Sequence, residues 1–144
     1  MRGNKSKGIK VFCIVGVIVA LFTLMVFIKT RDLRELESVA SKIQVKTGQL
    51  ISRSSQNSGN VLGKPIYADL NLYYKPLNNY SKRDLYNEII SLLEKNNCKR
   101  DSINIVPDYY SGSMRGDTDS FALIRVGVYI YPDINLVGIR YTHR

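Results

Sequence analysis

The hydrophobic residues of this chain form one long unbroken run, followed by several short periodic patterns. Residues 11–28 make up the unbroken run, and none of these 18 residues carries a charge. A helix of that length spans about 27 Å, close to the ~30 Å hydrocarbon core of a bilayer, and Lys10 and Lys29 can snorkel to its two surfaces. The run therefore predicts a transmembrane helix.

A weaker helical pattern follows over residues 31–56. Apolar and small side chains recur there at every third or fourth position: Leu33, Leu36, Ala40, Ile43, Thr47 and Leu50. This spacing is typical of a short coiled-coil stalk, and equally of an amphipathic helix that lies on the domain or on lipid headgroups. Residues 52–60 are rich in Ser, Asn and Gly and predict a polar linker. We therefore expect a stalk helix and a linker over residues 29–60.

The folded domain is expected over residues 61–144, and its first half contains a strand and a helix. Residues 66–74 alternate apolar and polar side chains, which predicts a half-buried strand. Ser81 and Asp84 have the spacing of a capping box. Helical periodicity follows them as far as about residue 97.

The second half of the domain predicts further strands. Residues 103–106 are a short apolar strand, and residues 107–120 are rich in turn residues and predict a long loop. Residues 121–131 alternate most clearly, and residues 136–141 suit a return strand. The order β-α-β-β-β predicts an α+β fold, a two-layer unit with one helix on a four-stranded sheet. The opposite face of that sheet is then a contact surface, unless the stalk helix covers it.

The charge distribution explains the net charge of +9 without nucleic acid. Residues 1–10 carry four basic and no acidic side chains, residues 29–60 carry six and three, and residues 61–144 carry eleven and nine. Most of the excess therefore flanks the apolar run, where basic residues set topology and attract anionic headgroups. We expect a membrane as partner and no nucleic acid.

Topology follows from the same charges, although the two flanks are nearly equal in Lys and Arg. The amino flank has no acids, and long domains translocate largely regardless of their charge. We expect a cytoplasmic tail over residues 1–10 and the domain outside, as in a bacterial inner-membrane protein. A cleavable signal is disfavoured, because the apolar run is long and the one tolerable site, after Ala40, lies beyond a charged stretch.

Two small features concern packing inside the membrane and the thiols. Cys13, Gly16, Ala20 and Thr23 share one face of the predicted helix, which permits close approach of a second helix. A homodimer through the transmembrane and stalk helices is one expectation, and chance alignment of small residues is the alternative. Cys98 is expected to be a buried small residue, since no base is at hand to activate a nucleophile.

Candidate catalytic residues are few. His143 is the only histidine and is expected to be a frayed terminal residue, so neither zinc ligation nor Ser/His chemistry has a candidate set. Asp108, Asp117 and Asp119 share the predicted loop, and a hydrolase or glycan-binding site there is one alternative, with solvated turn carboxylates as the other. We expect no enzyme activity, no metal and no cofactor.

Tyrosine is the remaining signal, with ten residues, all in the domain. Many must be ordinary half-buried sheet residues, yet tyrosine and arginine are also enriched at binding surfaces. The candidates for contacting a partner combine these two residue types in the loop and the clearest strand: Tyr109, Tyr110, Arg115, Arg125, Tyr129 and Tyr131.

Lys7 and Gly8 before an apolar helix resemble the leader of type IV pilin-class proteins. That resemblance implies helix-then-sheet architecture and processing after Gly8, but Cys13 stands where the family has a glutamate. A pilin-like subunit is therefore an alternative. The main expectation is a single-pass envelope protein whose domain binds another protein, as an accessory component of an assembly or as an inhibitor or immunity-type binder.

Overall fold

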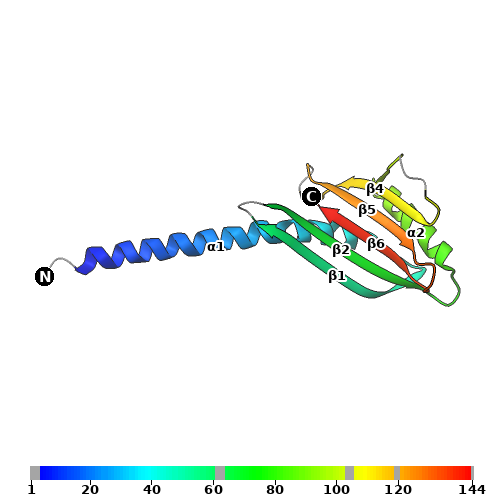
Figure 1. Cartoon of the computed structure of the whole chain (residues 1–144), viewed down its shortest axis with the longest axis horizontal. Coiled ribbons are helices and arrows are strands. Elements are labelled where there is room, and N and C mark those ends of the chain that lie inside the picture. Colours follow the sequence, from blue (N-terminus) through cyan, green and yellow to red (C-terminus); the bar gives the residue numbers. More distant parts are fainter. Residues whose placement is uncertain (1–3, 61–63, 103–105, 119–120, 144) are drawn as a thin grey trace.

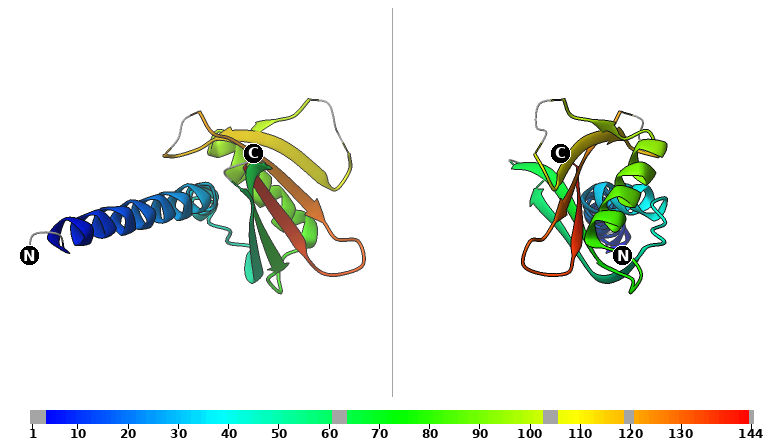
Figure 2. Two further views of the ribbon diagram at one scale, coloured as in Figure 1. Left: turned by 60° about the vertical axis from the view of Figure 1, so that its left-hand side comes forward. Right: turned by 90° about the vertical axis from the view of Figure 1, so that its right-hand side faces the viewer.

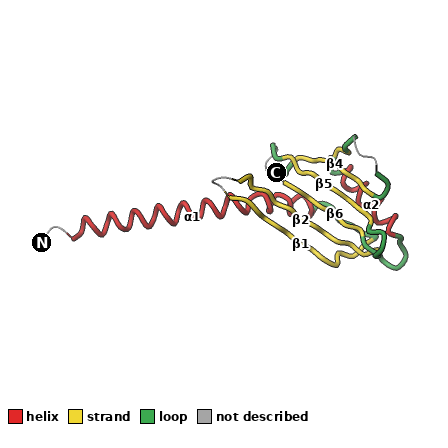
Figure 3. Tube along the Cα trace, viewed as in Figure 1, coloured by secondary structure: helices red, strands yellow, loops and turns green. Residues whose placement is uncertain are grey.

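A computed structural model of the chain describes residues 4–60, 64–102, 106–118 and 121–143. One long helix precedes a small domain in which a second helix packs on a sheet (Figures 1 and 3). The elements are α1 (Asn4–Ser41), β1 (Gly48–Asn60), β2 (Lys64–Pro76), α2 (Lys82–Lys95), β3 (Lys99–Arg100), β4 (Tyr109–Arg115), β5 (Leu123–Ile130) and β6 (Val137–His143).

The strands form one antiparallel sheet of six strands in the order β1-β2-β6-β5-β4-β3. The C-terminal part of α1 and the whole of α2 pack on the same face of this sheet, as Figure 2 shows. The predicted α+β class is therefore confirmed. The predicted count of four strands is wrong, because two segments expected to be linker and loop are strands.

The predicted linker over residues 52–60 is the first of these corrections. These residues belong to β1, which pairs with β2 along most of its length, for example Ser54 with Asn71 and Gln56 with Asp69. As the edge of the sheet, β1 is exposed on both faces over residues 49–56. It therefore needs no apolar alternation, and backbone hydrogen bonds to β2 compensate for its low strand propensity.

Helix α1 is continuous from the apolar run into the domain and ends at Ser41, well before the predicted end of the stalk near residue 56. Leu36 and Val39 of α1 are buried in the domain core, as is Ile43 just beyond the end of the helix. Two arrangements were expected for this segment, a coiled-coil stalk and an amphipathic helix that lies on the domain or on lipid headgroups. The structure shows a helix that lies on the domain. Burying such a side chain contributes about 1.5–3 kcal/mol, so this part of α1 is integral to the fold.

The predicted loop over residues 107–120 is the second correction, because Tyr109–Arg115 forms β4. Its inward positions are Tyr110, Gly112 and Met114, and the glycine among them hides the alternation in the sequence. Residues 103–105 of the predicted short strand lie outside the described residues, and the strand before β4 is β3 instead.

The predicted helix of the domain is confirmed as α2. The Ser81 hydroxyl accepts a hydrogen bond from the Asp84 backbone N–H at 3.1 Å, and the Asp84 carboxylate accepts one from the Ser81 N–H at 2.8 Å. Behind this cap, Leu85, Ile89 and Leu93 are fully buried. They pack against the inward residues of the central strands, which completes a core between the helices and the sheet.

Candidate functional site

The face of the sheet that points away from both helices is left uncovered. Residues of five neighbouring strands, β1, β2, β6, β5 and β4, lie there and line a shallow groove of about 760 Å³. We call this surface the open face. Its principal residues are Asp69, Asn71 and Tyr73 of β2, Tyr109 of β4, Arg125 and Tyr129 of β5, and Arg140 of β6. Because both helices pack on the other side, no described helix shields these side chains.

Tyrosine rings form the floor of one end of the open face. The Tyr129 ring lies across Gly138 on the neighbouring strand, where an added Cβ would come within 2.5 Å of the ring carbon Cζ. Tyr131 packs edge-on against Tyr129, with ring centroids 4.9 Å apart and an interplanar angle of 74°. Its hydroxyl donates to the Tyr129 hydroxyl at 3.2 Å. Such edge-to-face pairs are favourable and orient the rings.

The phenol of Tyr129 stays protonated at neutral pH. Burial, followed by hydrogen bonds with Tyr131 and Tyr73, raises the pKa of Tyr129 far above its usual range. Tyr73 adds a third ring, 6.2 Å from Tyr131 between centroids. Tyr129 therefore offers a neutral hydroxyl, and the cluster offers apolar ring surface.

The charged groups of the open face fall into one pair and one isolated cation. Arg140 donates to Asp69 at 3.0 Å, and the Thr142 hydroxyl donates to the other oxygen of that carboxylate at 2.8 Å. The hydrogen bond to Asp69 raises the pKa of Arg140 above its usual value. Arg125 is exposed and makes no hydrogen bond or ion pair with any residue that the structure describes. Its guanidinium keeps five N–H donors for an external acceptor.

The predicted partner-binding residues divide between the two faces. Tyr109, Arg125 and Tyr129 lie on the open face, and Tyr131 joins them through Tyr129. Tyr110 lies on the helix side and is 0% exposed. Arg115 lies at the end of β4, paired across the strands with Leu123.

Asp69, Tyr73 and Arg140 belong to the same surface but were absent from the predicted set. Asp69 and Tyr73 occupy the polar-side positions of the alternating pattern over residues 66–74, which is the signal that marks them. Arg140 belongs to β6, four strands after β2 in sequence order, yet it is directly opposite Asn71 in the register.

No protein-family model matches the chain, and searches of curated proteins and of solved structures return no match.

The acidic residues of the predicted loop are not brought together. Asp108 lies just before β4 and pairs with Arg83. Asp117 lies just beyond the other end of β4 and bonds Lys42 and Ser38. The strand between them separates the two carboxylates by about 20 Å or more, at ~3.3 Å per residue. Asp119 lies outside the described residues. Among the described residues, no group of three or more His, Cys, Asp or Glu side chains suits a metal ion.

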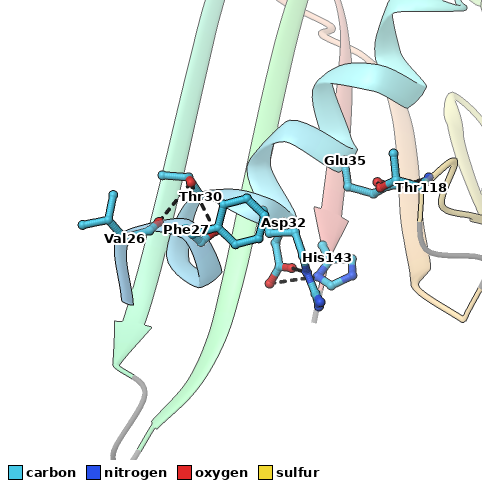
Figure 4. A network of polar contacts seen from close by, with 8 residues as sticks. Val26, Phe27, Thr30, Asp32, Glu35, Thr118 and His143 are labelled. Carbon is cyan, nitrogen blue, oxygen red and sulfur yellow. Dashed lines mark hydrogen bonds and ion pairs between the residues drawn. The ribbon is translucent and has the colours of Figure 1, made fainter. Parts of the chain in front are cut away.

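A second polar cluster lies where α1 enters the domain (Figure 4). Glu35 accepts a hydrogen bond from the backbone N–H of Thr118 at 2.8 Å and one from the Thr118 hydroxyl. His143 faces Asp32, with 3.3 Å between Nδ1 and Oδ2, and its side chain is only 11% exposed. The expectation of a frayed terminal histidine is therefore wrong. Antiparallel pairing carries β6 to His143, and α1 covers the end of that strand.

The remaining sequence candidates lie outside these clusters. Cys98 is buried, as expected, and burial raises the pKa of its thiol. Cys13, Gly16, Ala20 and Thr23 lie on the exposed N-terminal part of α1. An added Cβ at Gly16 would meet no atom within 4 Å, so this face has room for a neighbour, and helix packing there stays a prediction.

Proposed function

We propose that this chain is a single-pass membrane protein that presents its α+β domain outside the cytoplasm and binds another protein through the open face. The observation that carries the proposal is the uncovered arrangement of Tyr109, Arg125 and Tyr129 on one sheet surface. Tyrosine and arginine are the residue types that dominate binding energy at protein interfaces. Arg125 in particular is a cation without a partner among the described residues.

The N-terminal part of α1 supports the membrane half of the proposal. α1 is long and apolar enough to cross a membrane, and its large hydrophobic residues from Phe12 to Phe27 are exposed in the folded chain. A signal sequence shares these properties. Cleavage after Ala40, however, would remove Leu36 and Val39, both 0% exposed, from the core. Loss of two such side chains would cost several kcal/mol, about 2–5 kcal/mol for each, so retention of the helix is part of the proposal.

The shape and polarity of the open face favour a protein over a small molecule. Small-molecule sites are concave and mostly apolar. The groove here is shallow, and Asp69, Asn71, Arg125 and Arg140 supply polar groups along it. A rigid tyrosine floor with exposed polar groups around it matches the organisation of an interface that forms and dissociates.

Site-specific photocrosslinking in cells tests the binding half. A photoreactive amino acid at Ser111, on the open face, should trap one discrete partner. The same probe at Asn87, exposed on α2 on the other side of the domain, should not trap it. The partner is then purified, and its affinity is measured for the full-length chain in detergent.

The affinity measurement decides the assignment. Tyr129→Ala should weaken binding by roughly tenfold or more, as expected for an interface anchor. Lys95→Ala, an exposed change at the end of α2, should leave the affinity unchanged. Equal trapping from Ser111 and Asn87, or full affinity of both Tyr129→Ala and Arg125→Ala, would overturn the assignment of the open face.

Protease digestion of intact cells and of inverted membrane vesicles tests the topology. The domain should be cleaved from outside in cells and protected in inverted vesicles. The opposite pattern would place the domain in the cytoplasm and overturn the proposed orientation.

A further inference from the structure

We propose that the domain makes a second contact with the membrane that holds α1, through the turn between β4 and β5 that carries Phe121. The inference rests on the membrane-spanning role of α1 proposed above, and is independent of the partner bound by the open face. Helix and turn would then hold the domain in one orientation over the lipid headgroups.

The β4–β5 turn is tied directly to α1. Thr118 bonds Glu35 through its backbone and its hydroxyl, and Asp117 accepts a hydrogen bond from the Ser38 hydroxyl at 2.9 Å. Lys42 forms an ion pair with the same aspartate. Residues 117 and 118 therefore cannot move far from α1 without breaking several hydrogen bonds.

The distance along the helix places this turn close to the lipid. Glu35 lies seven residues beyond Ile28, the end of the apolar run, which is about 10 Å of helix. The headgroup layer of one leaflet is roughly 5–8 Å thick. A side chain that projects from the turn towards the membrane thus needs to bridge only a few ångströms to reach the headgroups.

One end of the domain lies on the side from which α1 leaves it. In Figures 1 and 2, the end of β4, the start of β5 and the C-terminal end of β6 lie on the side from which α1 leaves the domain. The contact between His143 and Asp32 also joins the end of β6 to α1 at this level. The β5–β6 turn lies at the opposite end of the domain (Figure 1).

The chemistry of this end suits a lipid surface. Phe121 is 92% exposed, the highest value among the large hydrophobic residues described, and Leu123 on β5 is 53% exposed. Exposed aromatic and aliphatic side chains gain free energy when they enter the interfacial region.

The charges near this end of the domain also favour a lipid surface. Arg31 and Arg34 are exposed on α1, and Arg115 lies opposite Leu123. The carboxylates of Glu35 and Asp117 are already engaged within the domain. Arg31 also pairs with Asp32 at 3.5 Å, so the charge argument rests on Arg34, which complements anionic headgroups by about 1 kcal/mol near the surface. A protein that covers Phe121 is the competing occupant.

The chain contains no tryptophan, so one substitution creates a specific fluorescent reporter. Phe121→Trp is placed in the full-length chain and reconstituted in nanodiscs made with or without brominated phosphatidylcholine. Bromine quenches only tryptophan that touches the lipid. We expect a blue-shifted emission for the Phe121→Trp variant and loss of most of that emission in brominated lipid.

Two matched reporters make the result unambiguous. Ile134→Trp, 49% exposed in the β5–β6 turn at the far end, should not be quenched. Phe22→Trp, 69% exposed within the apolar run, should be quenched strongly. If the Phe22→Trp reporter is unquenched, α1 does not span the bilayer and the proposed function fails. If that reporter is quenched while the Phe121→Trp reporter behaves like the Ile134→Trp reporter, only the second membrane contact is wrong.

A blue shift of the Phe121→Trp reporter without lipid quenching would also overturn the inference, because it would show that protein covers the turn. Adding phosphatidylglycerol should increase quenching of the Phe121→Trp reporter, and Arg34→Gln should reduce that increase. An increase that Arg34→Gln leaves intact would remove Arg34 from the contact.

Discussion

Glu35 and Thr118 are joined by two hydrogen bonds, although 83 residues separate them in the sequence. The carboxylate belongs to α1 and the donors belong to the β4–β5 turn, so the pair connects the N-terminal helix to the far half of the sheet. Glu35 is 4% exposed, so its carboxylate depends on the Thr118 donors, which themselves lie on an exposed residue.

Removing the Glu35 carboxylate should destabilise the domain. Glu35→Ala leaves the Thr118 N–H without its acceptor, and we expect the free energy of unfolding to fall by about 2–3 kcal/mol. Glu35→Gln keeps one acceptor oxygen, so its free energy of unfolding should fall by less. Thermal unfolding of the full-length chain in detergent measures both, with the exposed Glu94→Ala on α2 as the matched control. Equal melting temperatures for Glu35→Ala and Glu94→Ala would contradict the structural role of the pair.

Acidification should weaken the attachment of the loop between α1 and β1 to α2. Glu88 accepts hydrogen bonds from the Lys46 and Thr47 backbone N–H groups at 3.0 and 2.9 Å, and from the Thr47 hydroxyl at 2.6 Å. Burial alone would raise the pKa of Glu88, but the hydrogen bonds from Thr47 outweigh it and lower that pKa below its usual value.

The lowered pKa of Glu88 determines the direction in which stability changes with pH. The folded chain binds the Glu88 proton more weakly than the unfolded chain, so the contribution to stability is present above about pH 4.3 and is lost as pH falls through the lowered pKa. Unfolding followed between neutral and acidic pH should show a smaller dependence on pH for Glu88→Gln than for the parent chain. An identical dependence in both would contradict the prediction.

Gly112 is expected to tolerate no side chain. An added Cβ would lie 2.9 Å from each of the Cys98 Sγ, the Lys99 carbonyl oxygen and the Tyr110 hydroxyl. The backbone oxygen cannot turn away, so Gly112→Ala should cost about 1–3 kcal/mol through overpacking. Denaturant unfolding measures the loss, and Ser113→Ala on the opposite face of β4 serves as the control. A fully stable Gly112→Ala would show that β4 shifts freely.

Gly16 should control helix association in the membrane, if the small-residue face packs against a second copy. Gly16→Leu would fill the space that close helix approach requires and should reduce energy transfer between labelled chains in liposomes. Val17→Leu, on a different face of α1, should have little effect. Unchanged transfer in Gly16→Leu would exclude this face from association.

Several elements could be predicted from the sequence because their stabilising groups are neighbours along the chain. The apolar run of residues 11–28 needs only its own composition to predict a spanning helix. Ser81 and Asp84 determine the start of α2 through a cap that closes within four residues. The alternation of β5 matches its buried positions, Ile124, Val126 and Val128, because its two faces meet different surroundings.

Part of the candidate site could be predicted in the same way. Arg125 and Tyr129 alternate with apolar residues in the clearest predicted strand, and they lie on the open face. The sequence did not show that Tyr109 and Tyr110 lie on opposite faces of the sheet, because this segment was expected to be a loop. Only a strand sends neighbouring side chains to opposite faces. Asp69, Tyr73 and Arg140 join the surface through strand pairing, which no local pattern contains.

The sequence by itself determined the apolar helix, α2 and its cap, the alternation of the central strands and the α+β class, all through local composition and periodicity. Only the tertiary structure decided that the polar residues 52–60 form an edge strand, that α1 ends at Ser41, and that His143 is buried against Asp32. Those features depend on backbone pairing with β2 and on packing between segments far apart in the chain. Hydrogen bonds between such segments leave no periodic signature in the side chains that precede or follow them.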